Sequence, residues 1–386
     1  MISTRAARVA CTTVTAAGLL MTGLAGPASA ASNGRPKAGS PAKFTTFPGR
    51  LYSVAATSAN NVWAAGLHPD SSLIAHWNGT AWTQSLSNNL GYFIGVATDS
   101  RTDAWAVGGT NWSSPTSTLI EHWNGTTWTQ VPSPSPDGGG YLNGVTAISR
   151  TDAWAVGLIA SGGPGNSGAT TTPLIEHWEG TAWEQVPCPV PASGGQFYSV
   201  SGTSATDVWA VGSTGANASG SGQQALIEHW DGTAWTLVPS PGLPGTGNYL
   251  HAVDATSPVD AWAVGTTDFT DHQDPLILHW NGTAWQQVPS NSGSPDAQLN
   301  SVAAISGSDA WAVGMTRPST CNPGCETLIL RWNGAAWSPV PSPDPPAGYL
   351  NDLLGVVAIC PHNAWAVGTT DYADTLIAHW NGKAWS

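Results

Sequence analysis

The chain has 386 residues, with 24 Asp plus Glu against 11 Lys plus Arg and a formal net charge of −13. Such an acidic surface repels phosphate backbones, which argues against nucleic acid as a partner. The 45 Gly and 29 Pro would suit a disordered chain, but 22 Trp predict a packed fold.

The first thirty residues have the pattern of a secretory signal peptide. Arg5 and Arg8 form a positive end, an apolar run extends from Val14 to Leu24, and Ala28-Ser29-Ala30 is a small-residue cleavage site. We therefore predict a secreted chain with a signal peptide over residues 1–30, a flexible tail over residues 31–42 and one domain over residues 43–386. No other segment has the roughly 18 apolar residues that a membrane span needs.

Seven copies of one pattern fill the predicted domain. Most copies contain a Trp-Ala-Val-Gly stretch, a stretch like Leu-Ile-Glu-His-Trp, an Asn-Gly turn, and Ala-Trp followed by Val-Pro. The opening Trp residues are 42 to 55 residues apart and lie at Trp63, Trp105, Trp154, Trp209, Trp262, Trp311 and Trp365. Short strands and tight turns at this period are typical of propeller blades. We predict an all-β fold, a seven-bladed β-propeller of four-stranded antiparallel blades.

The second copy shows how a blade is divided. Its strands are expected at residues 92–97, 104–108, 119–123 and 127–131, with a two-residue hairpin turn at Asn124-Gly125. Because successive turns alternate between the two faces of the disc, the short polar turns and the Asn-Gly turns share one face. The loops of variable length and the Pro-rich crossovers share the other, which is the predicted binding face because loops on a rigid scaffold usually carry function.

The two ends of the domain are expected to meet. The sequence stops just after Trp385, where other copies continue into Val-Pro-Ser-Pro, and Phe44-Thr45-Thr46-Phe47-Pro48 resembles the missing Trp-Thr-Gln-Val-Pro. We predict that residues 43–48 form a closing strand on the outer edge of the last blade, where they would protect an open edge.

Each copy carries three Trp, which we expect to pack between blades. In the alternative, the outermost rings, such as Trp128, protrude as sugar-stacking platforms. An Asp or Asn begins the second strand of each copy, and a His precedes the second Trp in six copies, so we predict a hydrogen bond between them in most blades. Arg331 takes the His position in the sixth copy and would meet Asp309. The alternative is a ring of metal-binding or catalytic His.

Four cysteines follow the predicted signal peptide. Cys321 and Cys325 flank Asn-Pro-Gly in one loop, a spacing that a local disulfide can close in an oxidising compartment, with zinc binding as the alternative. Cys188 and Cys360 are expected to be unpaired and buried.

Across residues 43–386 the blade plan resembles the kelch and galactose-oxidase superfamily, although its second strand ends Ala-Val-Gly where kelch repeats have Gly-Gly. The spacing from Gly125 to Trp128 is similar to the Asp-box hairpin of sialidase-type propellers, with Trp123 in place of the aspartate. The Trp density resembles tectonin-like bacterial propeller lectins, which implies sugar binding without chemistry. Neither the Arg triad of sialidases nor the Tyr-Cys-His copper site of the oxidases is recognisable.

Two variable loops combine carboxylates with an aromatic ring, as a sugar or calcium site would require. The alternative is that their Asp residues only start turns. A third loop carries Trp112, the only Trp outside the triplets, which either stacks on a ligand or caps the disc. The candidate ligand-binding residues are Trp112, Asp268, Phe269, Asp271, His272, Asp274, Asp371, Tyr372 and Asp374. No catalytic residue, no metal-ligand set and no cofactor is assigned, although these loops could hold calcium.

These features predict a monomeric, secreted, non-catalytic propeller that binds extracellular or cell-wall carbohydrate through its variable-loop face. One alternative is a polysaccharide hydrolase or lyase that uses loop carboxylates. The other is an extracellular scaffold for protein interactions.

Overall fold

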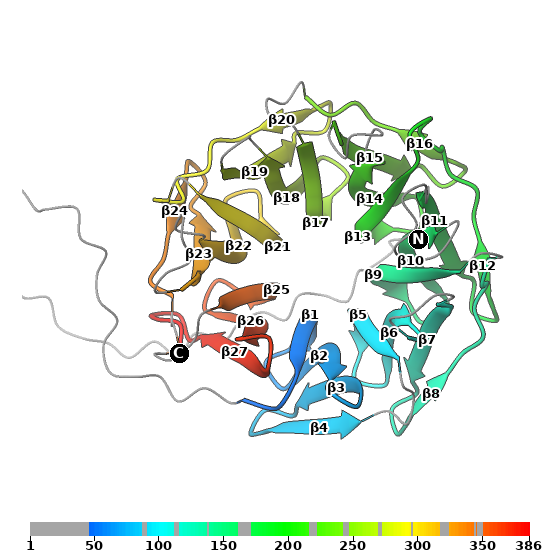
Figure 1. Ribbon diagram of the computed structural model, residues 1–386, viewed down its shortest axis with the longest axis horizontal. Coiled ribbons are helices and arrows are strands. Elements are labelled where there is room, and N and C mark those ends of the chain that lie inside the picture. The colour runs from blue at the N-terminus through cyan, green and yellow to red at the C-terminus, as the bar shows by residue number, and fades with distance from the viewer. Residues whose placement is uncertain are drawn as a thin grey trace, which may run out of the picture.

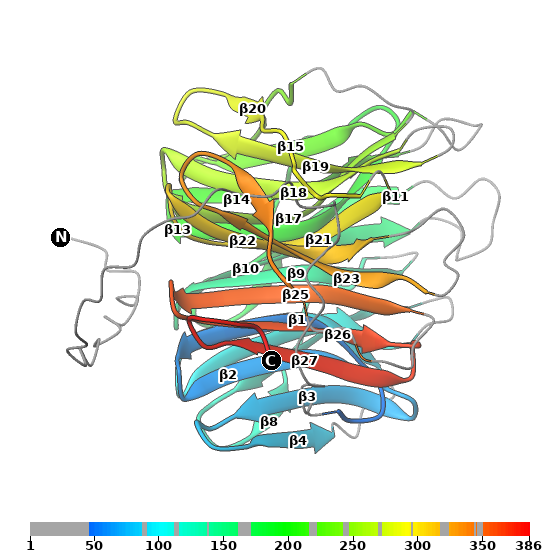
Figure 2. The same ribbon diagram turned by 90° about the vertical axis from the view of Figure 1, so that its left-hand side faces the viewer.

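The computed structural model describes residues 46–86, 91–111, 116–136, 139–160, 171–215, 222–241, 247–268, 272–294, 296–316, 324–342, 345 and 350–386. The described residues form seven antiparallel sheets arranged around a central axis, as Figure 1 shows. Seen from the side, the sheets make a disc whose strands run from one face to the other (Figure 2). The predicted seven-bladed β-propeller is therefore confirmed. No helix in the described part of the chain is long and apolar enough to cross a membrane.

The first strand of each blade lines the axis, and the second strand pairs with it. The innermost strands are β1 (Arg50–Ser58), β5 (Tyr92–Ser100), β9 (Gly140–Ser149), β13 (Gly195–Ser204), β17 (Gly247–Ser257), β21 (Ala297–Ser306) and β25 (Asn351–Cys360). The second strands are β2 (Asn61–His68), β6 (Asp103–Gly109), β10 (Asp152–Ala160), β14 (Asp207–Thr214), β18 (Asp260–Asp268), β22 (Asp309–Thr316) and β26 (Asn363–Thr370).

The third and fourth strands complete each blade toward the rim. The third strands are β3 (Ser71–Trp77), β7 (Thr118–Trp123), β11 (Thr171–Trp178), β15 (Ala225–Trp230), β19 (Gln273–Trp280), β23 (Glu326–Trp332) and β27 (Asp374–Trp380). The outer strands are β4 (Trp82–Leu86), β8 (Trp128–Gln130), β12 (Trp183–Gln185), β16 (Trp235–Leu237), β20 (Trp285–Gln287) and β24 (Trp337–Pro339).

The seventh blade differs from the predicted plan because its sheet has three strands, β25, β26 and β27. Two segments from opposite ends of the chain share the outer edge of β27. The backbones of His379 and Ser386 exchange two hydrogen bonds of 2.9 and 3.0 Å. At the other end of β27, Thr375 N donates to Phe47 O at 2.8 Å, and Gly49 N donates to Ala373 O at 2.7 Å. Residues 43–45 lie outside the described residues, so the full closing strand over residues 43–48 stays a prediction.

Indole rings join neighbouring blades at every interface. The opening Trp of each blade lies with its centroid 4.8 to 5.4 Å from two rings of the next blade, and the circle closes where Trp365 meets Trp77 and Trp82. Six of the seven outer Trp are buried, and Trp128 packs edge-on against Trp63. The idea that the outer rings protrude as sugar platforms is therefore wrong, because the opening Trp of the preceding blade packs on each of them.

The predicted bond between the turn acid and the strand His is present in all six blades that contain the His. In each, His Nε2 donates to an Asp or Asn Oδ1 at 2.6 to 3.0 Å. In the sixth blade, Arg331 donates two bonds of 3.0 Å to Asp309 instead. The His rings serve blade structure, since the centroids of all six also lie 3.9 to 4.2 Å from the ring centroid of their own opening Trp.

Cys188 is free and half-buried, and burial raises the pKa of its thiol to about 12. Cys325 and Cys360 are each disulfide-bonded. They are not bonded to each other, because they lie at opposite ends of β25, whose ten residues span about 33 Å. The expectation of an unpaired Cys360 is therefore wrong, although the residue is buried as expected. Cys321 lies outside the described residues, so its pairing with Cys325 stays a prediction.

Candidate functional site

A ring of seven side chains, one per blade, lines the axial channel at the predicted binding face. Each follows the first buried Leu or Phe of its innermost strand. We call this set the mouth ring: Tyr52, Ile94, Asn143, Tyr198, His251, Asn300 and Leu354. In every blade the pairing register with the second strand shifts at this position, which marks a β-bulge. A bulge changes the direction of a side chain. Here it turns the mouth-ring residue toward the channel, where regular strand alternation would point it to the other side of the sheet.

The residue after each mouth-ring position is small because the innermost strands of adjacent blades approach closely there. A Cβ on Gly144 would lie 3.0 Å from the Cα of Ser199 in the next blade. Three blades have Ser instead, and the Ser hydroxyl accepts a hydrogen bond from the next blade, as Ser199 Oγ does from Val253 N at 3.2 Å. These contacts fix the radius of the channel and so the spacing of the mouth ring.

The mouth ring encloses a cavity of about 240 Å³ that opens on the crossover face. Two Tyr, one His, two Asn and three Ser supply polar atoms, and Ile94 and Leu354 supply apolar surface. The described lining contains no Asp or Glu. The cavity therefore offers aromatic and amide groups without a carboxylate pair.

Several mouth-ring side chains are held by the neighbouring blade. Asn143 Nδ2 donates to Phe197 O at 2.7 Å, and Asn300 Nδ2 donates to Leu353 O at 2.9 Å and to Asp352 Oδ1 at 2.7 Å. His251 Nδ1 lies 2.8 Å from Leu299 O. A carbonyl oxygen only accepts, so Nδ1 carries the proton, and the lone pair of the neutral ring is on Nε2.

A second set of side chains lies two positions before the mouth ring and supports it. Gln196 Nε2 donates to Tyr198 Oη at 2.6 Å, and the Tyr249 ring stacks 6.4 Å from His251. Burial raises the pKa of the Tyr198 hydroxyl, so this Tyr stays neutral at physiological pH. Because these orientations exist before any ligand arrives, binding at the mouth ring would cost little ordering of side chains.

The described residues of the fifth variable loop lie near the mouth or at the rim. Asp268 ends β18 and accepts a 2.7 Å hydrogen bond from Gln273 Nε2. The pKa of Tyr249 is raised, first by burial of its hydroxyl and then by the charge of Asp268. His272 and Asp274 approach each other to 3.7 Å and are both partly exposed. Asp274 lines a separate rim cavity of about 280 Å³ with Pro275 and Ser292. Of these three residues, Asp268 is therefore the one that lies next to Tyr249, which supports the mouth ring.

The described residues of the seventh loop serve the seam between the chain ends. Asp371 and Tyr372 have left-handed backbone, with φ of 51° and 58°. The Arg50 guanidinium lies 4.3 Å from the centroid of the exposed Tyr372 ring, and Arg50 Nε donates to Tyr372 O at 3.0 Å. Asp371 Oδ1 accepts a hydrogen bond from Leu350 N. The backbone of Asp374 forms an isolated antiparallel β-bridge with Pro48. The structure does not bring this loop together with the fifth loop, because the sixth blade lies between them.

Trp112, Phe269 and Asp271 lie outside the described residues, so their roles stay predictions. Among the described residues there is no group of three or more His, Cys, Asp or Glu that could hold a metal ion. The mouth ring was not predicted. Its signal is present in the sequence, however, because residue types change from copy to copy at this one position while the buried positions on either side stay nearly uniform.

No family model and no curated protein matches the chain. Solved structures of low identity do match. YCF48 bound to D1 peptide is 14% identical, with a TM-score of 0.54 over 87% of this chain and 96% of that one. The GH74 xyloglucanase from Xanthomonas campestris is 14% identical, with a TM-score of 0.54 over 88% of this chain and 54% of that one. A PL25 ulvan lyase bound to -[GlcA(1-4)Rha3S]- is 8% identical, with a TM-score of 0.53 over 85% of this chain and 91% of that one.

At these identities the similarity shows the propeller fold alone. The matched proteins include a peptide complex and two proteins that act on polysaccharides. None of these three names is that of a kelch or tectonin-like protein, so that finer resemblance stays a prediction.

Proposed function

We propose that this chain is a secreted, non-catalytic propeller that binds extracellular carbohydrate at its mouth ring. The supporting observation is that aromatic rings and oriented amides surround one open cavity of about 240 Å³. Sugars present C–H faces that pack on aromatic rings and hydroxyls that exchange hydrogen bonds with amide groups. A concave site with a few placed polar groups is the usual form of a small-ligand site.

The charge of the site favours neutral sugars over polyanions. The described cavity lining has no Lys or Arg, and the chain as a whole is acidic. An anionic polymer would therefore meet repulsion from the acidic chain, which the Arg50 guanidinium beside Tyr52 offsets only in part. Because glycoside hydrolysis needs two carboxyl groups about 5 to 10 Å apart, the described lining favours binding over hydrolysis. The secretion signal predicted from the sequence supports an extracellular ligand.

A glycan array followed by calorimetry tests the proposal. We expect neutral oligosaccharides to bind, and Tyr198→Ala and His251→Ala to weaken binding at least tenfold while the fold is retained. Leu237→Ala is the matched control, because Leu237 is 53% exposed on an outer strand. Binding that survives both mouth-ring changes but is lost in Tyr372→Ala would assign the ligand to the seventh loop instead. A flat array together with binding of a peptide library would favour the scaffold alternative.

A further inference from the structure

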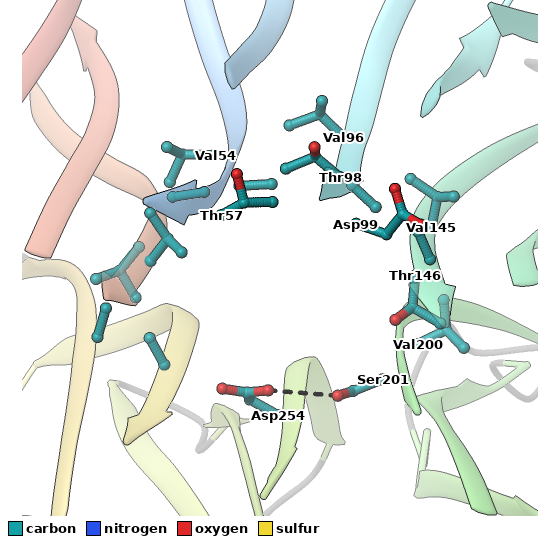
Figure 3. A pocket seen from close by; sticks show the side chains of 18 of the residues that line it. Val54, Thr57, Val96, Thr98, Asp99, Val145, Thr146, Val200, Ser201 and Asp254 are labelled. Atoms are coloured by element: carbon teal, nitrogen blue, oxygen red, sulfur yellow. Dashed lines mark hydrogen bonds between the residues drawn. The ribbon is translucent and has the colours of Figure 1, made fainter. Parts of the chain in front are cut away.

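The axial channel contains a second cavity, of about 270 Å³, toward the face that carries the turns between first and second strands (Figure 3). We call it the turn-face chamber. One Val from the same position of every blade lines it: Val54, Val96, Val145, Val200, Val253, Val302 and Val356. Val145 and Val200 also line the mouth cavity, so the valines lie at the boundary between the two. Ala and Ile side chains extend this aliphatic wall.

Two carboxyl groups face the chamber from different blades, Asp99 of β5 and Asp254 of β17, as Figure 3 shows. Protein donors hold Asp254. Its Oδ1 accepts from Ser201 Oγ at 3.3 Å and its Oδ2 accepts from Ala304 N at 2.8 Å. Asp254 is thus a fixed part of the wall, whereas Asp99 Oδ1 has no hydrogen-bond partner among the described residues.

Asp99 is a departure from the repeat. The fourth and fifth blades have Thr203 and Thr256 at this position, and each hydroxyl donates to the acid that holds the strand His, Asp207 or Asp260. In the second blade a carboxyl group stands there instead and meets another acid, Asp103.

Asp103 is fully buried, and its Oδ1 accepts from His122 Nε2 at 2.6 Å. The other oxygen of this acid, Asp103 Oδ2, and Asp99 Oδ1 are buried without a hydrogen-bond partner in the described part of the chain. The hydroxyl that donates to this acid in the fourth and fifth blades is absent here, so a proton or a cation is the natural link between the two carboxyl groups.

Electrostatics agree with this geometry. Burial, followed by the neighbouring Asp103 carboxylate, raises the pKa of Asp99 to about 6, and Arg150 and Ser100 act in the opposite direction. The titratable or charged groups around Asp99 are Asp103 and His122 of its own blade, Arg150 of the next blade, and Asp254 across the chamber. Two close carboxyl groups share a proton at low pH, and this proton is easily lost near neutrality.

We propose that the turn-face chamber binds a primary ammonium group on an aliphatic stem, with the stem along the valine wall and the ammonium on Asp99. Such a group has an apolar body and a charged tip, which matches aliphatic walls with one available carboxylate. Its three N–H donors can also reach nearby hydroxyls, of which Thr57, Thr98 and Thr146 line the chamber. A cavity that combines aliphatic side chains, hydroxyl groups and a perturbed carboxyl group is a candidate ligand site. The ligand is either a free alkylamine or a lysine side chain of a partner.

Calorimetry on the full chain tests the proposal with n-pentylamine and with 1-pentanol, which has the same stem and no charge. At pH 7.5 the amine should bind at least tenfold more tightly than the alcohol. At pH 5, one unit below the pKa of Asp99, that preference should fall about tenfold, because binding must then displace the shared proton into solvent. Equal affinity for amine and alcohol at pH 7.5 would overturn the proposal.

Asp99→Thr installs the residue of the fourth and fifth blades and should abolish the preference for the amine. Glu184→Gln removes a charge from the exposed part of an outer strand and should leave the preference unchanged. Retained amine preference in Asp99→Thr would overturn the proposal. In the unmodified chain, addition of pentylamine should lower the pKa of Asp99 followed by carboxyl ¹³C NMR, and an unmoved pKa would also overturn it.

Binding of Nα-acetyl-lysine methylamide as tightly as pentylamine would identify a lysine side chain as the ligand, and binding of pentylamine alone would identify a free amine. Tyr198→Ala should leave amine binding intact, which separates this site from the carbohydrate site of the mouth ring.

Discussion

Two buried glutamates give the stability of this propeller an unusual pH dependence. Glu176 of β11 is 0% exposed, and neither of its carboxyl oxygens has a hydrogen-bond partner among the described residues. Burial raises the pKa of Glu176 from 4.5 to about 8, and Glu228 in the next blade is shifted in the same way. Both side chains are therefore protonated in the folded protein at pH 7.

The sign of the effect follows from the direction of the shift. An unfolded chain releases the Glu176 proton near pH 4.5, while the folded chain keeps it up to about pH 8. Stability is therefore full below pH 4.5 and falls as the pH rises toward 8. Each pKa unit is worth about 1.4 kcal/mol, so each glutamate accounts for a loss on the order of 4 kcal/mol across this window.

The informative change is Glu176→Leu, because the fifth and sixth blades carry Leu278 and Leu330 at the same register position. Denaturant unfolding followed by Trp fluorescence measures the unfolding free energy at pH 5 and at pH 8. We expect the loss between these two pH values to be smaller in Glu176→Leu than in the unmodified chain, and the difference to be on the order of 4 kcal/mol. Glu176→Gln keeps the side-chain size and should reduce the loss in the same window by a similar amount, with the loss due to Glu228 remaining. Glu184→Gln, on the exposed part of β12, should follow the unmodified chain. Parallel curves for Glu176→Leu and the unmodified chain from pH 5 to pH 8 would refute the reasoning.

Two further predictions concern the blade interfaces. Trp209→Ala should lower the unfolding free energy by about 3–5 kcal/mol, since Trp209 is 1% exposed and packs on Trp280 and Trp285, whereas Leu237→Ala should change it by less than about 0.5 kcal/mol. Equal losses in the two variants would show that the indole contacts do not hold the blades together. Arg331→His, which restores the residue of the other six blades, should cost under about 1 kcal/mol, whereas Arg331→Leu leaves Asp309 without its two bonds and should cost about 1–3 kcal/mol. Thermal unfolding distinguishes these outcomes, and a more stable Arg331→Leu variant would contradict the role assigned to the pair.

The contacts within one blade could be predicted from the sequence because they are local. The hairpin at Asn124-Gly125 and the bond from His122 to Asp103 follow from turn chemistry and strand alternation over about twenty residues. The partner of Trp105 is harder to predict, because Trp178 and Trp183 come from the next blade and their position depends on the closed ring.

The candidate site could not be predicted because it depends on a bulge. Simple alternation gives no reason for Tyr198 to face the axis, and the extra residue that turns it inward changes the register by one. The loop residues favoured by the sequence follow turn rules well, but Tyr372 contacts Arg50 of the first strand. That contact joins two segments more than 300 residues apart, so no local pattern reveals it.

The shared edge of β27 has a consequence for how the molecule is assembled. Phe47 and Thr375 are 328 positions apart in the sequence. During synthesis, Phe47 is therefore made long before its partner in β27, and it has no partner until almost all blades have been made. A chain exported through a narrow pore would complete its circle only after residues 373–386 had crossed. We expect a late ring-closure step in refolding, and a permuted chain that links Ser386 to Thr46 and opens at a crossover elsewhere should move this step to the new break.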